Sequence, residues 1–564
     1  MPNKTISDTR GLYGKIKDEL HKDLQIERDY MSSKLLKGTF ILTLGMVLSK
    51  VLGLLYVIPF NAIVGADGLS LYQYAYVPYT IFLSIATGGL PLAVSKFVAK
   101  YNALGEYAIG QKLFKSSLKI MMVTGFIAFL MMYFSAPSLA AAMRSVDGFS
   151  VEEITTVMRA VSFALILIPV MSMIRGYFQG NESMGPTSVS MVVEQLIRVV
   201  VLLGGSFVVV YLLDGSIVTA ISVATFAAFI GAIGSLAILL WNWKKSKPSL
   251  DAQLLKDKGN VHIPLAQMYK EIIIYAIPFV FVGVAMSLFQ LVDQLTFNKA
   301  MADIGLGHTS ETALGILNVS AQKLVIIPMT LATGFSMAIV PSVTKAFVEN
   351  NKVEYTNQLN QAFQILLFLT LPAVFGMSLL AEPIYTLFYG YDALGVSVLQ
   401  TYAPTAVLFA GFSVSAAILQ GINQQKYTVL SLLVGILIKL ALNIPFIHLF
   451  ETEGSVYATT LGYLAATSIN MYVIYYFTGF KYNTIAKRTL LMAIFTAIMA
   501  GAVWLTTTGL SFFLDSTNRW QAIIIIIIGV AIGAIFYFAL ALKSKLAHRL
   551  FGSKIERLKN KLGV

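Results

Sequence analysis

The chain has 564 residues, of which 57% are hydrophobic and 12% are charged, and its mean hydropathy is +0.74. A soluble globular protein carries about twice this charged fraction, so the composition excludes a soluble globular fold. The sequence contains no cysteine, which excludes disulfides and thiolate chemistry. The net charge of +13 is better explained by cytoplasmic loops that face anionic lipid than by nucleic-acid binding.

The apolar residues form long blocks separated by short polar segments. A bilayer core of about 30 Å requires about 20 apolar residues as an α-helix, and the alternation typical of an outer-membrane barrel is missing. We therefore predict an all-α polytopic membrane protein with 14 transmembrane helices. The predicted helices span residues 36–63, 72–98, 113–136, 155–180, 184–212, 216–242, 269–298, 312–345, 357–380, 396–420, 425–450, 454–479, 486–508 and 519–543.

Loop charges predict that both termini lie in the cytoplasm. With residues 1–35 inside, the cytoplasmic segments and their flanks hold about 32 of the 41 lysines and arginines, and the outer segments hold about four. This asymmetry follows the positive-inside rule. Residues 10–31 place leucine and isoleucine at helical spacing, which predicts an amphipathic helix on the inner membrane surface.

An internal repeat links the two halves of the chain. Residues 178–198 align without gaps with residues 419–439, so that a Gln-Gly pair coincides and Arg198 falls on Lys439. A second match, at a similar offset, places the ATG of 86–88 on the ATG of 332–334.

We interpret these matches as a duplication of six spans. Because six crossings return the chain to its starting side, the copies form two lobes in a parallel pseudo-twofold repeat, as in some transporters. Two C-terminal helices lie outside the repeat. The predicted parts are a cytoplasmic segment (1–35), an N-lobe (36–243), an inter-lobe loop (244–268), a C-lobe (269–479), the two extra helices (480–545) and a basic cytoplasmic tail (546–564).

Seven ionisable residues lie deep in the predicted spans, and five of them are basic. They are Lys50, Arg175, Glu194, Arg198, Asp293, Lys323 and Lys439. Such a residue costs about 2.5–3.5 kcal/mol to insert at a helix centre and normally faces a protein interior or a wet cavity. The basic excess predicts a cationic site for an anionic substrate group, such as a phosphate.

Each of these residues also has a structural interpretation. Glu194 and Arg198 are four residues apart and can pair on one helix face. Arg175 lies near a span end, from which its side chain can reach the interface. Asn443, one turn after Lys439, can satisfy that lysine.

Asp293 is interpreted equally well as a counter-ion, a cation ligand or the partner of a lysine in its lobe. Lys50 and Lys323 are harder to explain structurally, because neither has an acidic residue three or four positions away.

Glycines and prolines mark expected bends and hinges. In the second span Pro91 follows Gly88 and Gly89, and in the eighth span Pro328 follows Lys323. Such breaks are tolerated where the backbone lines a cavity or a neighbouring helix satisfies it.

The sequence contains no HExxH, CxxC, GxSxG or P-loop pattern, and its five histidines lie in connecting segments or near span ends. We therefore expect no catalytic group, no metal site and no cofactor.

Two stretches resemble the MurJ lipid II flippases. SKVLGLL (49–55) is similar to the first-span signature of that family, and residues 320–347, continued by 354–373, are similar to its eighth-span motif. The resemblance extends over nearly the whole chain and fits the Gram-positive type, which is related to the sporulation protein SpoVB. The family is part of the multidrug/oligosaccharidyl-lipid/polysaccharide flippase superfamily.

The resemblance implies that lipid II, the undecaprenyl-pyrophosphate-linked peptidoglycan precursor, moves from the inner to the outer leaflet of the bacterial cytoplasmic membrane by alternating access. Lys50 and Lys323 match basic residues that hold the pyrophosphate in a central cavity, and the last two helices match a groove for the lipid tail. Membrane lipids and the cell-wall synthesis machinery are further expected partners. Coupling to the membrane potential or to a monovalent ion is expected.

The sequence departs from the family pattern at the proposed site. Tyr56 stands where a second basic residue is expected in the first span, and lysine replaces arginine at both matched positions, which loses the bidentate fork for phosphate. Arg198 and Lys439 are candidates for the missing charge.

Other functions stay open at this point. The same fold suits a flippase for teichoic-acid, capsule or spore-wall precursors, or a cation-coupled drug exporter that depends on Asp293 or Glu194. A membrane glycosyltransferase or acyltransferase is disfavoured by short outer loops, and a scaffold is disfavoured by the cost of buried charges.

Overall fold

The computed structural model describes residues 45, 48, 49, 52, 53, 55–145, 148–259, 264–337, 343, 344, 346, 347 and 349–551. Lys50, the predicted amphipathic helix at 10–31 and the last 13 residues lie outside this part of the chain. The elements formed by the described residues are all helices. They are α2 (Val57–Thr87), α3 (Leu90–Leu104), α4 (Tyr107–Met143), α5 (Val151–Ser162), α6 (Ala164–Gly180), α7 (Met184–Phe207), η1 (Val208–Leu212), α8 (Ile217–Leu254), α9 (Leu265–Asp303), η2 (Gly307–Thr309), α10 (Ser310–Gly315), η3 (Ile316–Ala321), α11 (Gln322–Met337), α13 (Lys352–Leu379), α14 (Ala381–Tyr389), α15 (Ala393–Tyr402), α16 (Thr405–Gly421), α17 (Gln425–Thr478), α18 (Asn483–Leu510), α19 (Arg519–Lys543) and α20 (Leu546–Phe551).

Ten of these helical segments are long and apolar enough to cross a membrane, or eleven if the bent pair α15–α16 is one span. Two reasons contribute to the difference from the 14 predicted spans. Half of the first predicted span lies outside the described residues, and α17 contains two predicted spans joined at Glu451, where the backbone leaves helical geometry (φ 52°, ψ −132°). The chain is therefore a multi-pass helical protein.

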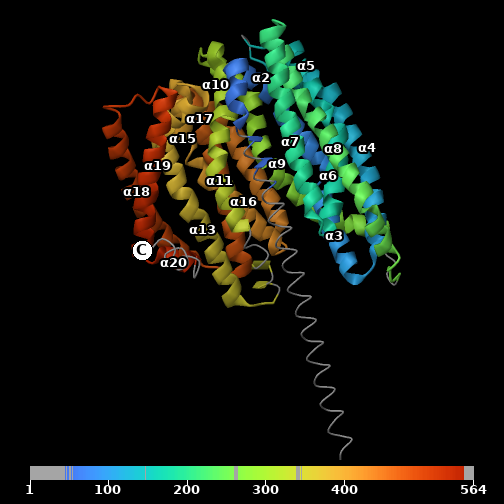
Figure 1. Cartoon of the computed structure of the whole chain (residues 1–564). Coiled ribbons are helices and arrows are strands. Elements are labelled where there is room, and N and C mark those ends of the chain that lie inside the picture. The colour runs from blue at the N-terminus through green and yellow to red at the C-terminus, as the bar shows by residue number, and fades with distance from the viewer. Residues whose placement is uncertain are drawn as a thin grey trace, which may run out of the picture.

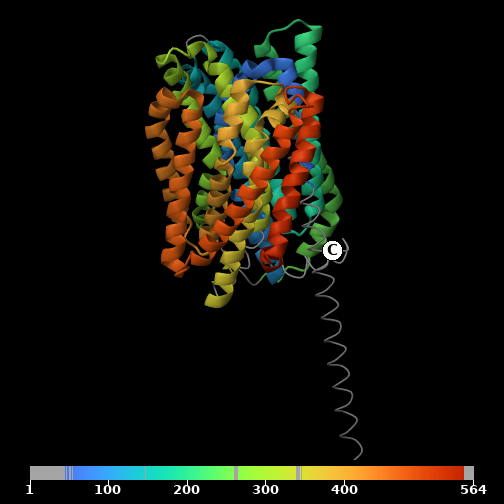
Figure 2. The ribbon, with the colours of Figure 1, turned by 90° about the vertical axis from the view of Figure 1, so that its left-hand side faces the viewer.

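The helices pack as two neighbouring sets, as Figure 1 shows in colours that run along the chain. Helices α3 to α8 pack on one another, and α11, α13 and α16 to α19 pack on one another. Helix α2 contacts both α4 to α8 and the later helices α9 and α10. Helices α18 and α19 form an edge of the bundle, which faces the viewer in Figure 2.

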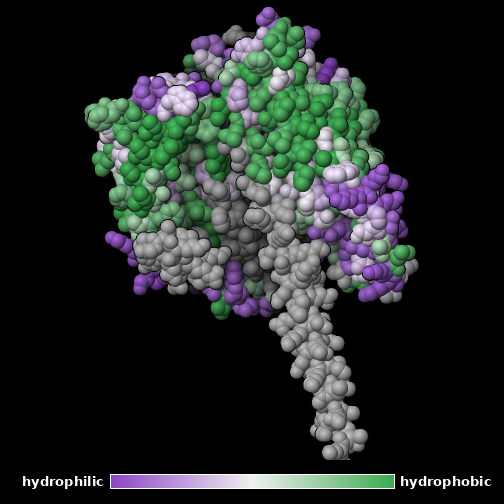
Figure 3. All heavy atoms as spheres, in the orientation of Figure 1, coloured by the Kyte–Doolittle hydropathy of each residue, from purple (hydrophilic) through white to green (hydrophobic). Residues whose placement is uncertain are grey.

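An apolar belt surrounds the bundle. Figure 3 shows hydrophobic residues across the middle of the molecule and hydrophilic residues toward its two ends. Large apolar side chains point outward on several helices, including Phe134, Trp241 and Ile527, each more than half exposed. Monomeric soluble proteins rarely expose apolar patches of this extent, so the belt is the lipid-facing surface.

The matched stretches of the sequence repeat have matching helix boundaries. Helices α6 and α16 each have 17 residues and end at the glycine of the Gln-Gly pair, and α7 and α17 begin four residues after that glycine. The second pair of matched stretches, 86–88 and 332–334, does not share a helix boundary. Helix α2 ends at Thr87, whereas α11 continues through residues 332–334.

The expected bend in the second span is present. Gly88 and Gly89 have left-handed backbone angles (φ 53° and 64°) and separate α2 from α3, and Pro91 lies in the first turn of α3. A left-handed pair is accessible to glycine without steric cost. By contrast, Pro328 lies inside the continuous helix α11, and the irregular turn is the π-helix η3 that precedes it.

Helix α3 packs closely on α6 at Gly176 and Gly180, and the contact at Gly176 is the tighter. A Cβ atom added to Gly176 of α6 would lie 2.4 Å from the backbone oxygen of Pro91. We expect Gly176→Ala to destabilise the purified protein by about 1–3 kcal/mol, because two backbones must move apart. Gly185→Ala is the matched control, since its Cβ has open space. Thermal unfolding in detergent measures both variants, and equal unfolding temperatures would contradict this packing argument.

Candidate functional site

Two cations from different helix sets meet at a group of tyrosines. Lys323 of α11 lies against Tyr56, at the start of α2, and Arg198 of α7 lies against Tyr72 and Tyr76 of α2. We call these five residues the tyrosine–cation cluster. The Lys323 Nζ donates to the Tyr56 hydroxyl at 3.0 Å, and the Arg198 Nη2 donates to the Tyr72 hydroxyl at 3.0 Å. The two hydroxyls lie 3.5 Å apart, so polar contacts connect the lysine to the arginine.

The tyrosine rings also contact the two cations. The Lys323 Nζ is 4.3 Å from the centre of the Tyr56 ring, and the Arg198 Cζ is 5.1 Å from the centre of the Tyr76 ring. Cation–π contacts of this kind stabilise a cation without neutralising it. Tyr76 also stacks on Tyr72 at a centroid distance of 5.2 Å, which holds both rings in place.

The tyrosine–cation cluster contains no acidic residue. Within the described part of the chain, neither Lys323 nor Arg198 forms an ion pair with a carboxylate, and the buried Nε of Arg198 has no hydrogen-bond partner. Both side chains are partly buried. Two partly desolvated cations held by neutral groups suit an anionic ligand, because the ligand would supply the missing counter-charge.

Lys50 is not among the described residues, so its position relative to the cluster stays a prediction. The neighbouring segment does reach the cluster, since the Lys323 Nζ also lies 3.5 Å from the backbone oxygen of Gly53. Tyr56, which replaces an expected cation, supplies the hydroxyl that joins Lys323 to Tyr72.

Glu194 pairs with a different arginine from the one we predicted. Its carboxylate lies 2.7 Å from the Nη2 of Arg175, not beside Arg198. Arg175 also donates to the hydroxyls of Ser190 and Ser235, each at 2.8 Å. Arg175 therefore does not extend to the interface as expected, because three partners on α7 and α8 hold it inside the helix set. This pairing leaves Arg198 free to reach α2.

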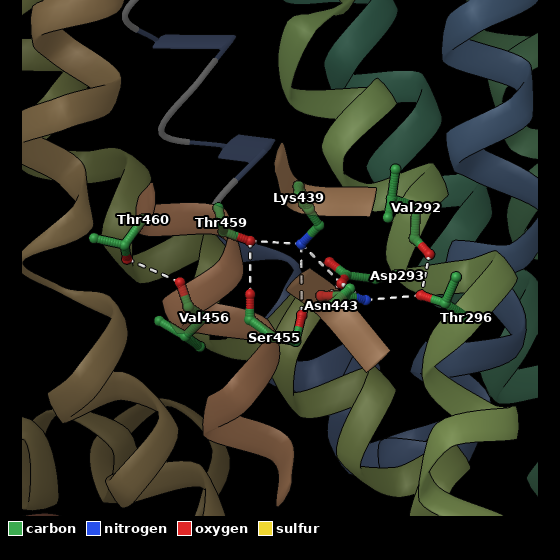
Figure 4. A network of polar contacts seen from close by, with 9 residues as sticks. All are labelled: Val292, Asp293, Thr296, Lys439, Asn443, Ser455, Val456, Thr459 and Thr460. Carbon is green, nitrogen blue, oxygen red and sulfur yellow. Dashed lines mark hydrogen bonds and ion pairs between the residues drawn. The ribbon is translucent and has the colours of Figure 1, made fainter. Parts of the chain in front are cut away.

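Lys439 is held in a second, fully buried network between α17 and α9 (Figure 4). Its Nζ lies 2.8 Å from Asp293 Oδ1 and donates to the Thr459 hydroxyl at 2.5 Å. Ser455 donates to the same carboxylate oxygen at 2.5 Å. Of the three interpretations of Asp293, this geometry matches the partner of a lysine within its own helix set.

Asn443 supports the carboxylate and not the lysine, in contrast to our expectation. Its Nδ2 donates to Asp293 at 3.2 Å and to the Thr296 hydroxyl at 2.7 Å. Within the described part of the chain, the polar contacts of Lys439 therefore go to α9 and to the part of α17 after Glu451, and they do not connect it to the tyrosine–cation cluster.

A third set of polar contacts, which sequence reasoning missed, joins α2 to α10 at the end of the bundle where α10 lies (top of Figure 1). The Tyr74 hydroxyl donates to Glu311 at 3.3 Å and accepts a hydrogen bond from Asn298. Thr312 donates to Asp67 at 2.5 Å. We call these residues the α2–α10 contacts. Glu311 is buried and has no charged residue near it in the sequence. The sequence therefore did not indicate that its partner is Tyr74 of α2.

An apolar groove of about 350 Å³ lies between α13, α14, α18 and α19. It is lined by residues such as Phe368, Pro372, Met499, Gly533 and Phe538. The groove includes residues of the last two long helices, for which the sequence resemblance implies a groove for the lipid tail. Among the described residues, no group of three or more His, Asp or Glu side chains is arranged to hold a metal ion.

The Lys439–Asp293 pair gives a direct test of its structural role. Removing one charge leaves the other buried and unpaired, so Lys439→Met and Asp293→Leu should each destabilise the protein by about 3–5 kcal/mol. The double variant should be destabilised by less than the sum, because no lone charge remains. Thermal or denaturant unfolding in detergent measures this cycle.

The control for this cycle is His448→Gln. It removes an exposed contact in which His448 Nε2 lies 3.7 Å from Asp303 Oδ2. Its effect should stay within about 1 kcal/mol. Strictly additive effects of the two buried substitutions would show that Lys439 and Asp293 do not stabilise each other.

Comparison with known proteins identifies the family. A family model described as a polysaccharide biosynthesis protein matches residues 35–347, and one described as the lipid II flippase MurJ matches residues 270–517. The chain is 43% identical over 533 residues to the lipid II flippase MurJ of Bacillus subtilis (strain 168), which covers 93% of this chain and 98% of that protein.

Solved structures show the same fold. An inward closed conformation of the lipid II flippase MurJ matches with a TM-score of 0.63 at 17% identity, over 90% of this chain and 99% of that one. An inward-facing multidrug resistance MATE family transporter of the MOP superfamily matches with a TM-score of 0.61 at 15% identity, over 76% of this chain and 94% of that one. By its identity to the Bacillus protein over nearly the whole chain, this protein belongs to the MurJ lipid II flippase family.

Proposed function

We propose that this chain is a lipid II flippase, a transporter and not an enzyme, which moves the undecaprenyl-pyrophosphate-linked precursor from the inner to the outer leaflet. The observation that carries the proposal is 43% identity over 93% of the chain to a protein named lipid II flippase. The tyrosine–cation cluster adds a chemical reason, because two cations without a carboxylate partner match a pyrophosphate.

The proposed architecture has 14 transmembrane helices in two six-helix lobes, with two extra helices at the C-terminal end. The matching boundaries of α6–α7 and α16–α17 support the parallel repeat. The excess of lysine and arginine in alternate loops supports cytoplasmic termini in the bacterial cytoplasmic membrane. With this orientation, the α2–α10 contacts lie on the outer side.

The proposed pyrophosphate site consists of Lys50, Lys323 and Arg198. Tyr56 positions Lys323 through its ring and its hydroxyl. Lys439 and Asp293, by contrast, are proposed to stabilise the second lobe, because their charges neutralise each other. The lipid tail is proposed to occupy the apolar groove of α13 and α19 while the sugar–peptide head crosses between the lobes.

We propose that transport proceeds by alternating access. The α2–α10 contacts close the outer side while the cluster attracts the pyrophosphate from the inside. The lobes then rock, and the left-handed pair Gly88–Gly89 between α2 and α3 is a hinge in this motion. The membrane potential, negative inside, acts on the empty basic site at about 2.3 kcal/mol per charge per 100 mV and favours its return.

A cation-coupled drug exporter is disfavoured by the charge pairing. Such an exporter needs a free carboxylate in the membrane, but Asp293 is paired with Lys439 and Glu194 with Arg175. After release, lipid II becomes the substrate of cell-wall synthesis enzymes, so a contact with that machinery on the outer side is part of the proposal.

Loss of the two lysines of the proposed pyrophosphate site should strongly reduce flipping. In cells depleted of other flippases, we expect the double variant Lys50→Ala/Lys323→Ala to lower the amount of lipid II accessible on the outer leaflet at least about tenfold, because two charge-assisted contacts to pyrophosphate are lost. Lys323→Arg should retain more activity than Lys323→Gln, because the arginine keeps the positive charge and the glutamine does not.

The matched control is Lys115→Ala/Lys119→Ala, which removes two exposed lysines of α4. Wild-type flipping by the Lys50/Lys323 variant, at equal expression, would disprove the site. If the protein flips a different polyprenyl-linked glycan and no lipid II, the proposed site would stand and the proposed cargo would be wrong.

Transport should depend on the membrane potential. In vesicles with a potassium gradient set by valinomycin, an inside-negative potential should accelerate lipid II flipping several-fold over zero potential, because it returns the basic site. A sodium gradient without a potential is the control. A rate that follows sodium and ignores the potential would contradict this coupling.

A further inference from the structure

A polar pocket lies at the end of the bundle where α13 and α18 begin, apart from the tyrosine–cation cluster and the apolar groove. Its volume is about 510 Å³. Helix α13 contributes amides, α18 contributes a hydroxyl and a guanidinium group, and α20 contributes a second guanidinium group. These lining residues are Asn360 and Gln364 of α13, Thr484 and Arg488 of α18, and Arg549 of α20.

The pocket concentrates positive charge. Arg488 and Arg549 both line it, and none of the described lining residues is acidic. The charge of Arg549 acts on Arg488, so the two guanidinium groups repel each other. The Nη1 of Arg488 donates to Gln364, a neutral amide, and Arg549 is exposed. This arrangement raises the local affinity for an anion.

Two buried amide atoms in the same pocket have no partner. Gln364 is only 1% exposed, yet its Nε2 has no hydrogen-bond acceptor, and the Oδ1 of Asn360 has no donor. Nearly all buried polar groups in proteins are paired, and an unpaired one costs about 1–3 kcal/mol. A ligand that accepts from Gln364 and donates to Asn360 would satisfy both.

These groups define the chemistry of the ligand. Two arginines and one amide donor fit a phosphate, which accepts several charge-assisted hydrogen bonds. The free acceptor on Asn360 fits a hydroxyl group next to that phosphate. Together these groups suit a phosphate ester that also carries a hydroxyl group.

The position of the pocket indicates a lipid and not a soluble phosphate. Helices α13, α18 and α19 are apolar enough to span a membrane, and the pocket lies at their polar ends, at the depth of lipid headgroups. Leu490 and Ile494 follow Arg488 on α18 and are 65% and 49% exposed, so they offer an apolar surface to acyl chains.

We propose that this pocket binds the headgroup of an anionic phospholipid with a hydroxylated headgroup, such as phosphatidylglycerol. The site is separate from the cargo site, so it does not depend on the proposed function. Arg488 and Arg549 hold the phosphate, and Gln364 and Asn360 bind the phosphate and the headgroup hydroxyl.

The test is lipid binding to the purified full-length chain, measured by native mass spectrometry and by thermal unfolding during titration with phosphatidylglycerol. Arg549→Gln should weaken binding about tenfold, and Arg488→Gln/Arg549→Gln should weaken it further, as charged hydrogen bonds are lost. Lys115→Gln/Lys119→Gln removes the same charge from α4 and should leave binding unchanged. Arg549 is exposed, so its variant is expected to fold even if the double variant does not.

Three results with the variants or with a neutral lipid would overturn the proposal, and a fourth concerns inorganic phosphate. The first three are unchanged phosphatidylglycerol binding in Arg549→Gln and in the double variant, an equal loss in the α4 control, or equally tight binding of zwitterionic phosphatidylcholine. Inorganic phosphate at millimolar concentration should neither displace the lipid nor raise the unfolding temperature. Full displacement by phosphate would overturn the assignment to a lipid.

Discussion

A charge inside a membrane-embedded bundle needs a partner, and the way in which each cation finds one organises this protein. Arg175 and Lys439 are neutralised within their own helix sets, by Glu194 and Asp293. Arg198 and Lys323 are held instead by tyrosines, which solvate a cation but leave its charge in place. The first arrangement joins helices into stable units, and the second keeps positive charge available where the two sets meet.

The sequence located the buried charged residues better than it predicted their partners. Burial cost picked out Lys323 and Arg198 among seven ionisable residues deep in the predicted spans. The pairing of Glu194 with an arginine 19 residues away was not predictable, because it depends on how α6 and α7 are rotated against each other. The tyrosines were missed for another reason: in a span without charges, Tyr72 and Tyr76 contribute to an apolar pattern, and nothing in that pattern shows their hydroxyls turning toward cations.

The fold shows the same division between local and long-range information. Span length and apolar character follow from lipid thickness, so the long helices were predictable. The left-handed break at Gly88–Gly89 was also predictable, since glycine accepts that geometry. The turn within α17 was placed between two predicted spans, but its geometry was not predictable, because Glu451 adopts a positive φ that its residue type does not favour. Tertiary packing must impose it.

The two basic residues matched by the repeat, Arg198 and Lys439, have diverged in their surroundings. Lys439 meets Asp293 on α9, and in the repeat that we propose the counterpart of α9 is the span at 36–63, which contains no acidic residue. Arg198 consequently has no inherited counter-ion. The halves of this protein are therefore not interchangeable: a tandem of two first halves would place an uncompensated arginine at both matched positions, and a tandem of two second halves would place a lysine paired with an aspartate at both. A single acidic position, present in one copy and absent from the other, makes a duplicated scaffold electrically asymmetric.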